Sequence, residues 1–337
     1  MTGFSRVWPK AMHRETVRVS RAGSQKLTVV LATWNGARWL PELLNSISEQ
    51  TLLPDRLIIL DDASTDETWT LVRSAQLAGV EVIATRHETN RGAIATFGEL
   101  LAMVDSEYFA LCDQDDVWLP DKLEKSVRLL ASSEADLVYT DLRVVDKNLR
   151  ELARSMWRLC NVVPVVGHPV VPLIIKNSVT GCTIVGRTSM LKKALPLPPG
   201  IPMHDWWLGV VAASCSGVVP FETPTVLYRQ HGGNVTGAYG NLWTRLARSS
   251  QRLGVYLDDR LAARRALMAG LKAHDIPGRY VFLSWFYRQS ALMRFIINPA
   301  YLAYTATHAT TLGFRNLVVD WIVTCAPIPA LCGRRSK

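Results

Sequence analysis

The acidic segment LCDQDDVW at 111–118 carries the clearest chemical signal in the sequence. If the apolar residues before it form a strand, alternate side chains face the same way, so Asp113 and Asp115 can converge on one ion. Carboxylates bind hard divalent cations, which complete their shell with water and phosphate oxygens. The alternative is an acidic surface turn, but such a turn seldom follows a fully apolar strand. We therefore expect Mg²⁺ or Mn²⁺ at this segment.

Polar residues also follow two other apolar runs. Asp61 and Asp62 end the run RLIILDD, where a carboxylate could accept hydrogen bonds from a nucleoside base or a ribose hydroxyl. The alternative is that Ser64 caps a helix and the acids lie near its positive end. Thr33 and Asn35 belong to TWNG, a turn by composition that follows the run LTVVLAT. We expect this turn to lie beside the same crevice.

The segment MHDWW at 203–207 places one carboxylate beside two tryptophans. An apolar cage raises the proton affinity of a carboxylate, which would suit Asp205 to act as a general base. Trp206 and Trp207 would offer a stacking surface for a sugar ring. A helix that starts here and buries its tryptophans in the core explains the composition equally well.

A polar loop, YRQHGGN at 228–234, follows the last apolar run before the basic C-terminal region. Here Arg229 could meet a phosphate, and His231 could complete the coordination shell of a metal ion. The alternative is an ordinary glycine-rich turn.

These residues lie between elements that alternate along the chain. Runs rich in Val, Ile and Leu predict buried strands at 27–33, 56–62, 80–86, 107–113 and 135–141, with a last strand at 225–230. Amphipathic segments predict helices at 38–50, from Ser64, at 92–104 and from Pro120. The alternation predicts an α/β fold with a doubly wound, mostly parallel sheet. Three of the strands end in acid (Asp61-Asp62, Asp113 and Asp141), and ligands bind beyond the carboxyl ends of such strands.

Charge divides the chain into three parts. The net charge is +5 over residues 1–26, −6 over 27–240 and +10 over 241–337. We expect a basic N-terminal extension at 1–26, a main domain at 27–238 and a basic, aromatic, helical region at 239–337. Basic flanks suit contact with an anionic surface, although they could serve only for solubility, and an acidic core suits a bound cation. Nucleic acid is not expected as a partner, because its binders concentrate positive charge on the recognition domain.

The sequence also bears on location. The basic, polar N-terminal segment lacks the apolar stretch of a secretory signal, and no run reaches about 18 apolar residues. The six cysteines have no paired spacing, so neither disulfides nor a structural zinc site is expected. We expect a cytoplasmic protein. Its C-terminal region would contact the inner face of the plasma membrane peripherally, or form a homodimer through the same face.

Taken together, the motifs resemble the inverting glycosyltransferases of family 2, which have the GT-A fold. The resemblance runs over 27–238 and rests on VVLATWNG, LIILDDASTDET, NRG at 90–92, FALCDQDDVWLPDKLE, MHDWW and YRQHGGN, in this order. The subset DQDDVW, HDWW and YRQHG resembles the bacterial rhamnosyltransferase-like branch. The resemblance implies a metal-dependent transfer of a sugar, rhamnose in this branch, from a dTDP- or UDP-linked donor. The acceptor would be a glycan or a lipid-linked saccharide in cell-surface polysaccharide synthesis.

The resemblance also implies roles for individual residues. Asp205 would be the catalytic base, Asp113 and Asp115 the DxD pair on the metal and diphosphate, and His231 a further metal ligand. The nucleotide and donor would be bound by Asp62, Thr33, Asn35 and Asp113. Apart from the resemblance, we also expect Asp61, Arg91 and Arg229 to bind the nucleotide or donor. The acceptor or sugar would be bound by Trp118, Trp206 and Trp207. The chain departs from the family pattern at Trp34, usually a smaller aromatic residue or histidine, and at His204, often an acid, which leaves the donor preference open.

Two other functions fit parts of the sequence. A nucleotidyltransferase would also use paired aspartates and Mg²⁺, but it would show a Gly-rich phosphate loop with a basic residue near the first strand. The segment TWNGARW offers little of that, and the chain has neither GxxxxGK[ST] nor GxGxxG. A nucleotide-sugar-binding protein without catalysis should lack the DxD pair or the base, and both are present.

Overall fold

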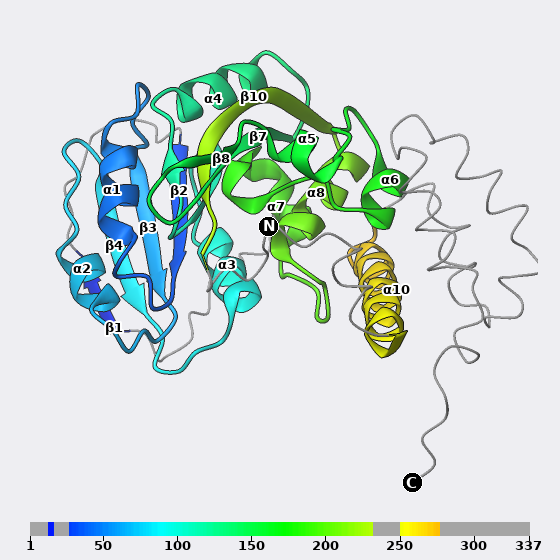
Figure 1. Cartoon of the computed structure of the whole chain (residues 1–337), viewed down its shortest axis with the longest axis horizontal. Helices are drawn as coiled ribbons and strands as arrows, with labels where there is room; N and C mark the ends of the chain where they lie inside the picture. Colours follow the sequence, from blue (N-terminus) through cyan, green and yellow to red (C-terminus); the bar gives the residue numbers. More distant parts are fainter. Residues whose placement is uncertain (1–12, 17–26, 232–249, 277–337) are drawn as a thin grey trace, which may run out of the picture.

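The computed structural model describes residues 13–16, 27–231 and 250–276, with side chains for 27–231 and 259–276. The described part is built around a ten-stranded sheet in the order β1-β4-β3-β2-β5-β9-β7-β10-β6, with β8 paired to β7. Helices cover both faces of this sheet (Figure 1). The α/β fold with a mostly parallel sheet is therefore confirmed.

One half of the sheet is parallel and follows the expected alternation of strands and helices. Its strands are β2 (Leu27–Thr33), β3 (Arg56–Asp61), β4 (Glu81–Arg86) and β5 (Tyr108–Asp113). The helices that follow them are α1 (Leu40–Ser48), α2 (Thr68–Ser74), α3 (Ala93–Ala102) and α4 (Lys122–Ala131). The strands are apolar on both faces because both are covered: Val29 and Leu31 pack on the side of α1, α2 and α4, whereas Val30 packs on the side of α3.

The register of these strands gathers their carboxyl ends at one edge. Thr33 pairs with Asp61 across β2 and β3, and Ala32 pairs with Asp113 across β2 and β5. The acids that end β3 and β5 therefore lie on either side of the end of β2.

The other half of the sheet mixes directions. Its strands are β6 (Val117–Trp118), β7 (Leu137–Val145), β8 (Glu151–Ala153), β9 (Val185–Arg187) and β10 (Val218–Arg229). The short strand β9 lies antiparallel between β5 and β7 and was not predicted, because three residues carry no periodic signal. The predicted strands at 135–141 and 225–230 are both confirmed and are longer than expected.

Asp141 does not end a strand, which corrects one expectation. It lies inside β7 and accepts hydrogen bonds from the N–H groups of Leu142 and Trp157 and from the hydroxyl of Ser155. It therefore anchors α5 (Met156–Cys160) to the sheet.

Two predicted helix starts are also wrong. The first helical residue of α2 is Thr68, and the hydroxyl of Ser64 instead accepts the N–H of Asn35 at 2.9 Å. Pro120 precedes α4, which begins at Lys122 after Asp121.

A second group of helices covers the face that carries α3. They are α6 (Val170–Ile175), α7 (Leu191–Ala194), α8 (His204–Ser214) and α10 (Ser250–Ala273). Helix α10 contacts α6 and α8 and buries Leu267 and Leu271 in the same core (Figure 1). It lies within the region 239–337, whose helical character stays a prediction, since residues 239–249 and 277–337 lie outside the described part.

The surface and the chain ends bear on the remaining expectations. Within the predicted N-terminal extension, β1 (His13–Thr16) pairs antiparallel with β4. Among the described residues, no helix combines the length and apolar character needed to cross a bilayer, and the four described cysteines are free.

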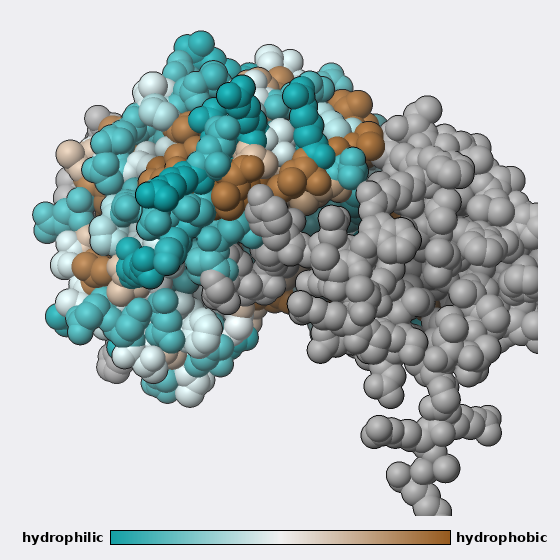
Figure 2. Space-filling view, in the orientation of Figure 1, coloured by the Kyte–Doolittle hydropathy of each residue, from teal (hydrophilic) through white to brown (hydrophobic). Residues whose placement is uncertain are grey.

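In Figure 2 the face around α1 and α2 is mainly hydrophilic, and apolar side chains gather toward β8 and α5, where Leu152 and Leu159 are exposed.

Candidate functional site

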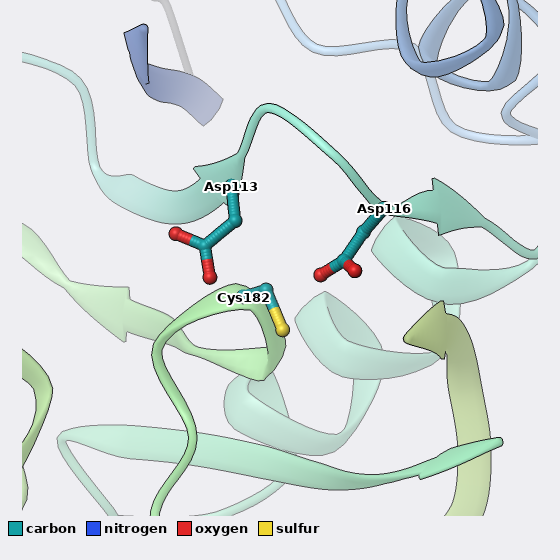
Figure 3. Close-up of side chains that lie close together, drawn as sticks. All are labelled: Asp113, Asp116 and Cys182. Atoms are coloured by element: carbon teal, nitrogen blue, oxygen red, sulfur yellow. The ribbon is translucent and has the colours of Figure 1, made fainter. Parts of the chain in front are cut away.

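The acidic loop after β5 differs from the expected extended strand. Residues 114 and 115 form a turn, so alternation stops at Asp113. The carboxylates of Asp113 and Asp116 face each other, and the Cys182 thiol lies between them on the 3₁₀ turn η1 (Gly181–Thr183) (Figure 3). Ligand atoms of these three residues lie within 4.8 Å of one another. Asp116, which was not predicted as a site residue, therefore joins Asp113 inside the loop.

Asp115 turns outward from this loop and meets His231. The distance from Asp115 Oδ2 to His231 Nε2 is 2.8 Å, and both side chains are 17% exposed. The imidazole also stacks on Trp39, with ring centroids 5.0 Å apart. The structure thus brings together two of the three residues expected to hold a metal ion, where solvent can reach them.

Electrostatics link the acidic loop to Asp205. Burial, together with the negative charges of Asp115 and Asp205, raises the pKa of Asp113 to about 7. Burial and the charges of Asp115 and Asp113 also hold the pKa of Asp116 well above its usual range. Negative charges this close favour a proton or a cation among them. The oxygen-rich loop fits a hard divalent cation, since Oδ2 of the buried Asp116 accepts no hydrogen bond from the described residues.

Asp205 lies in the first turn of α8 and is 8% exposed. Its Oδ2 accepts the backbone N–H of Gly181 at 2.9 Å, and its Oδ1 lies 3.4 Å from the side-chain amide nitrogen of Asn177. Burial outweighs these hydrogen bonds, which lower the pKa of Asp205, and the net effect raises that pKa to about 6. A carboxylate of this pKa is ionised at neutral pH and can accept a proton.

His204, the neighbour of Asp205, is buried and stacks on Phe97, with ring centroids 3.9 Å apart. Neither ring nitrogen has a hydrogen-bond partner among the described residues, and burial lowers the pKa of His204 to about 3. The ring is therefore neutral at physiological pH. Because His204 stands where the family pattern often has an acid, the position beside Asp205 carries one negative charge fewer.

Asp62 organises the turn before α3. Its Oδ1 accepts the N–H of Arg91 at 2.8 Å and lies 2.7 Å from His87 Nδ1, and its Oδ2 accepts the N–H of Gly92 at 2.8 Å. Gly92 has a φ of 82°, which favours glycine. The Arg91 side chain pairs with Glu99 and stays half exposed.

Asp61 is fully buried, and its carboxylate accepts the N–H of Ser64 at 3.0 Å and pairs with Arg86 at 3.4 Å. In this arrangement Asp61 shapes the loop after β3 and does not face solvent. A direct contact between Asp61 and a nucleotide stays a prediction that the geometry does not favour.

The loops after β2, β3 and β5 are tied together. The side-chain oxygen of Asn35 accepts the N–H of Thr65 at 2.8 Å. Gln114 accepts the N–H of Trp34 at 2.8 Å and donates to its carbonyl at 2.9 Å. Thr33 is buried at the end of β2, and its hydroxyl has no partner among the described residues. Trp34 is 53% exposed and gives this surface an aromatic face.

The expected phosphate contact of Arg229 stays a prediction that the geometry does not favour, because the protein itself surrounds its guanidinium. Arg229 is 1% exposed; Nε donates to the Asp115 carbonyl at 2.8 Å and Nη1 to the Lys147 carbonyl at 3.0 Å. Nη2 pairs with Glu42, and the guanidinium lies over the Trp39 ring at 4.5 Å. Arg229 therefore positions the acidic loop.

Two of the three tryptophans expected to bind sugar belong to the core. Trp118 and Trp207 are 2% and 0% exposed, and the indole N–H of Trp207 donates to the Ala194 carbonyl at 2.9 Å. The half-buried Trp206 donates its indole N–H to the Leu173 carbonyl. The helix-start alternative for MHDWW is the better description of these tryptophans.

Comparison with known proteins agrees with this architecture. A model of the family "Glycosyl transferase family 2" matches residues 28–192. The dTDP-rhamnosyl transferase RfbG of Shigella flexneri is 30% identical over 218 residues, which cover 62% of this chain and 74% of that protein. The uncharacterized glycosyltransferase alr2836 of Nostoc sp. is 25% identical over 62% of this chain and 66% of its own length.

Two solved structures share the fold. TarS (residues 1–349) from S. aureus superposes with a TM-score of 0.53 and 17% identity, over 91% of this chain and 83% of that chain. The mannosyltransferase PcManGT from Pyrobaculum calidifontis, solved with GDP-Man and Mn²⁺, gives a TM-score of 0.50 and 17% identity, over 89% and 87% of the two chains. The expected GT-A fold is confirmed. With the sequence match to RfbG, these findings show that the chain belongs to glycosyltransferase family 2.

Proposed function

We propose that this glycosyltransferase moves a sugar from a nucleoside-diphosphate donor to an acceptor hydroxyl, with a divalent cation and with inversion at the anomeric carbon. The observation that carries the proposal is the turn η1, where the Gly181 N–H binds the carboxylate of the buried Asp205 and the thiol of the next residue, Cys182, lies within 4.8 Å of a carboxylate oxygen of Asp113 in the acidic loop. A base and a donor-binding loop must lie this close for one sugar to reach both.

The cation would be held by Asp113, Asp115 and His231, with Asp116 behind them. Bound Mg²⁺ or Mn²⁺ would supply the positive charge that lets a diphosphate approach these carboxylates and that stabilises the departing nucleoside diphosphate. Asp115 and His231 already lie 2.8 Å apart, so a shared ligand would cost little rearrangement.

Asp205 would act on the acceptor. Its carboxylate takes the proton of the acceptor hydroxyl as that oxygen attacks the anomeric carbon from the face opposite the leaving group. The N–H of Gly181 holds the carboxylate in place through Oδ2. Attack from the opposite face gives a product of inverted configuration.

The nucleoside would lie on the surface formed by the loops after β2 and β3, near Thr33, Asn35 and the turn that Asp62 organises. The relative RfbG is a dTDP-rhamnosyl transferase, which supports dTDP-rhamnose as the first donor to test, with UDP-sugars next. TarS has been solved with UDP-GlcNAc and PcManGT with GDP-Man. The acceptor would be a glycan or a lipid-linked saccharide of the cell surface.

A donor screen tests this function. Purified protein is incubated with Mn²⁺, a lipid-linked saccharide fraction and one donor at a time: dTDP-rhamnose, a UDP-sugar or GDP-mannose. We expect release of nucleoside diphosphate from one donor class, abolished by chelation and restored by Mn²⁺. Folded protein that neither binds nor turns over any donor would contradict the proposal.

We also propose that the basic region 239–337 places the enzyme at an anionic membrane surface. Its net positive charge supports this. Retention in washed membranes at low salt and release at high salt is expected. A concentration-dependent homodimer without membrane retention would favour the alternative.

A further inference from the structure

A group of buried polar atoms without hydrogen-bond partners lies behind the acidic loop. Within the described part of the chain, Asp116 Oδ2, Trp118 Nε1, Lys122 Nζ and Ser126 Oγ have none. Asp116, Lys122 and Ser126 are fully buried, and Trp118 is 2% exposed. Buried polar groups are normally paired with protein or ordered water. Four such atoms between residues 116 and 126 therefore favour bound water.

These groups are close in space as well as in sequence. The ammonium of Lys122 lies 4.4 Å from the centre of the Trp118 ring, and Ser126 follows it by one turn of α4. Asp116 points inward from the loop, toward Cys182 (Figure 3). Lys122 and Asp116 are both fully buried, and no direct ion pair joins them within the described residues.

Water has the donors and the acceptor that these groups need. The ammonium, the indole N–H and the hydroxyl can donate, and the carboxylate oxygen can accept, so a water molecule can serve both sides. We propose that bound water bridges Lys122 to Asp116 and that Lys122 is thereby a positioning residue for the acidic loop. Burial lowers the pKa of Lys122 to about 8, so the ammonium keeps its charge at neutral pH.

A chain of contacts leads from this bridge to the outer carboxylate. Asp116 Oδ1 accepts the backbone N–H of Arg229 at 3.1 Å. Arg229 in turn donates to the carbonyl of Asp115, whose carboxylate meets His231. A charge on Lys122 that holds Asp116 thus also fixes Asp115. This inference rests on the proposed metal dependence, because its consequence is the geometry of the metal-binding loop.

The test compares Lys122→Met with Lys125→Met, an exposed lysine on the same helix that pairs with Asp121. Mn²⁺ binding in the presence of dTDP is followed by the loss of the free-ion electron paramagnetic resonance signal. We expect Lys122→Met to weaken Mn²⁺ binding at least tenfold and Lys125→Met to leave it unchanged. Lys122→Met with a lower melting temperature but unchanged Mn²⁺ binding would show a merely structural lysine and overturn the proposal.

A double variant keeps the test decisive if Lys122→Met folds poorly. Asp116→Asn with Lys122→Met removes both charges and keeps an acceptor for the Arg229 N–H. We expect the double variant to unfold at higher urea than Lys122→Met alone, because no buried charge is left without its partner. Additive losses would refute the bridge. If the unaltered protein binds no Mn²⁺, the proposed metal dependence fails, and the urea series still tests the bridge.

Discussion

The backbone N–H of Gly181 lies 2.9 Å from Oδ2 of Asp205, so the main chain of η1 holds one oxygen of the buried carboxylate, and the side-chain amide of Asn177 lies near the other. The next residue along the turn, Cys182, reaches the acidic loop at Asp113. Consecutive residues of η1 therefore contact the carboxylate on α8 and the loop after β5. This turn fixes the spacing between the proposed base and the proposed donor-binding acids.

Asp205→Asn tests the base. The substitution keeps the size of the side chain but removes its capacity to take a proton, so we expect transfer to fall by about 10²–10⁴-fold. Donor binding, measured by calorimetry, should change little. Asp105→Asn, at a half-exposed acid before β5, serves as the control and should retain full activity. Near-normal turnover of Asp205→Asn would remove Asp205 from this role.

The pH profile should show the same group. Burial raises the pKa of Asp205 to about 6, and a base works only when it is deprotonated. At saturating Mn²⁺ we expect kcat/KM to be constant above about pH 7 and to fall tenfold per pH unit below 6. The residual activity of Asp205→Asn should lack this acid limb. An unchanged limb in that variant would assign it to another group, such as Asp113.

The parallel half of the fold could be read from the sequence because its signals are local. Runs of Val, Ile and Leu predict strands covered on both faces, and the acids that end β3 and β5 predict the edge where the site lies. The sequence could not predict in which direction each acidic side chain of the loop points. The chain leaves the strand at Asp113, and the turn after it sends Asp115 outward and Asp116 inward.

Contacts between distant segments explain the other differences. Arg229 binds the backbone of Asp115, 114 positions earlier, and this tertiary contact buries a side chain that its loop composition predicted to be available for phosphate. Gly181 and Asn177 give no local signal at all. Only the packing of η1 against α8 shows that they hold Asp205.

Asp115→Asn tests the outer metal ligand. The amide keeps the backbone contact with Arg229 but loses the charge that faces His231, so we expect Mn²⁺-dependent donor binding to weaken at least tenfold. Calorimetry with and without Mn²⁺ measures the change. Asp121→Asn, an exposed acid at the start of α4, should behave like the unaltered protein. Equal Mn²⁺ dependence in both variants would contradict the assignment.

Gly36→Ala tests the link between the loops after β2 and β5. A Cβ at Gly36 would lie 2.1 Å from Oε1 of Gln114, whose amide bonds both the N–H and the carbonyl of Trp34. The amide must move, and the loss of these exposed bonds should cost about 0.5–1.5 kcal/mol in urea unfolding and raise the donor KM. Gly98→Ala, inside α3 and 3.3 Å from the Leu197 side chain, is the matched control. A donor KM equal in both would show that the link does not shape the donor site.

Arg229→Met separates a positioning role from a phosphate contact. The variant leaves the carbonyls of Asp115 and Lys147 without their donor, so we expect a loss of stability on the order of 3 kcal/mol in urea unfolding. Arg91→Met removes an exposed pair with Glu99 and should cost less than about 1 kcal/mol. If Arg229 instead bound the donor phosphate, its loss would weaken donor binding at unchanged stability. The two measurements on one variant therefore distinguish the buried guanidinium seen here from the phosphate ligand that its loop suggested.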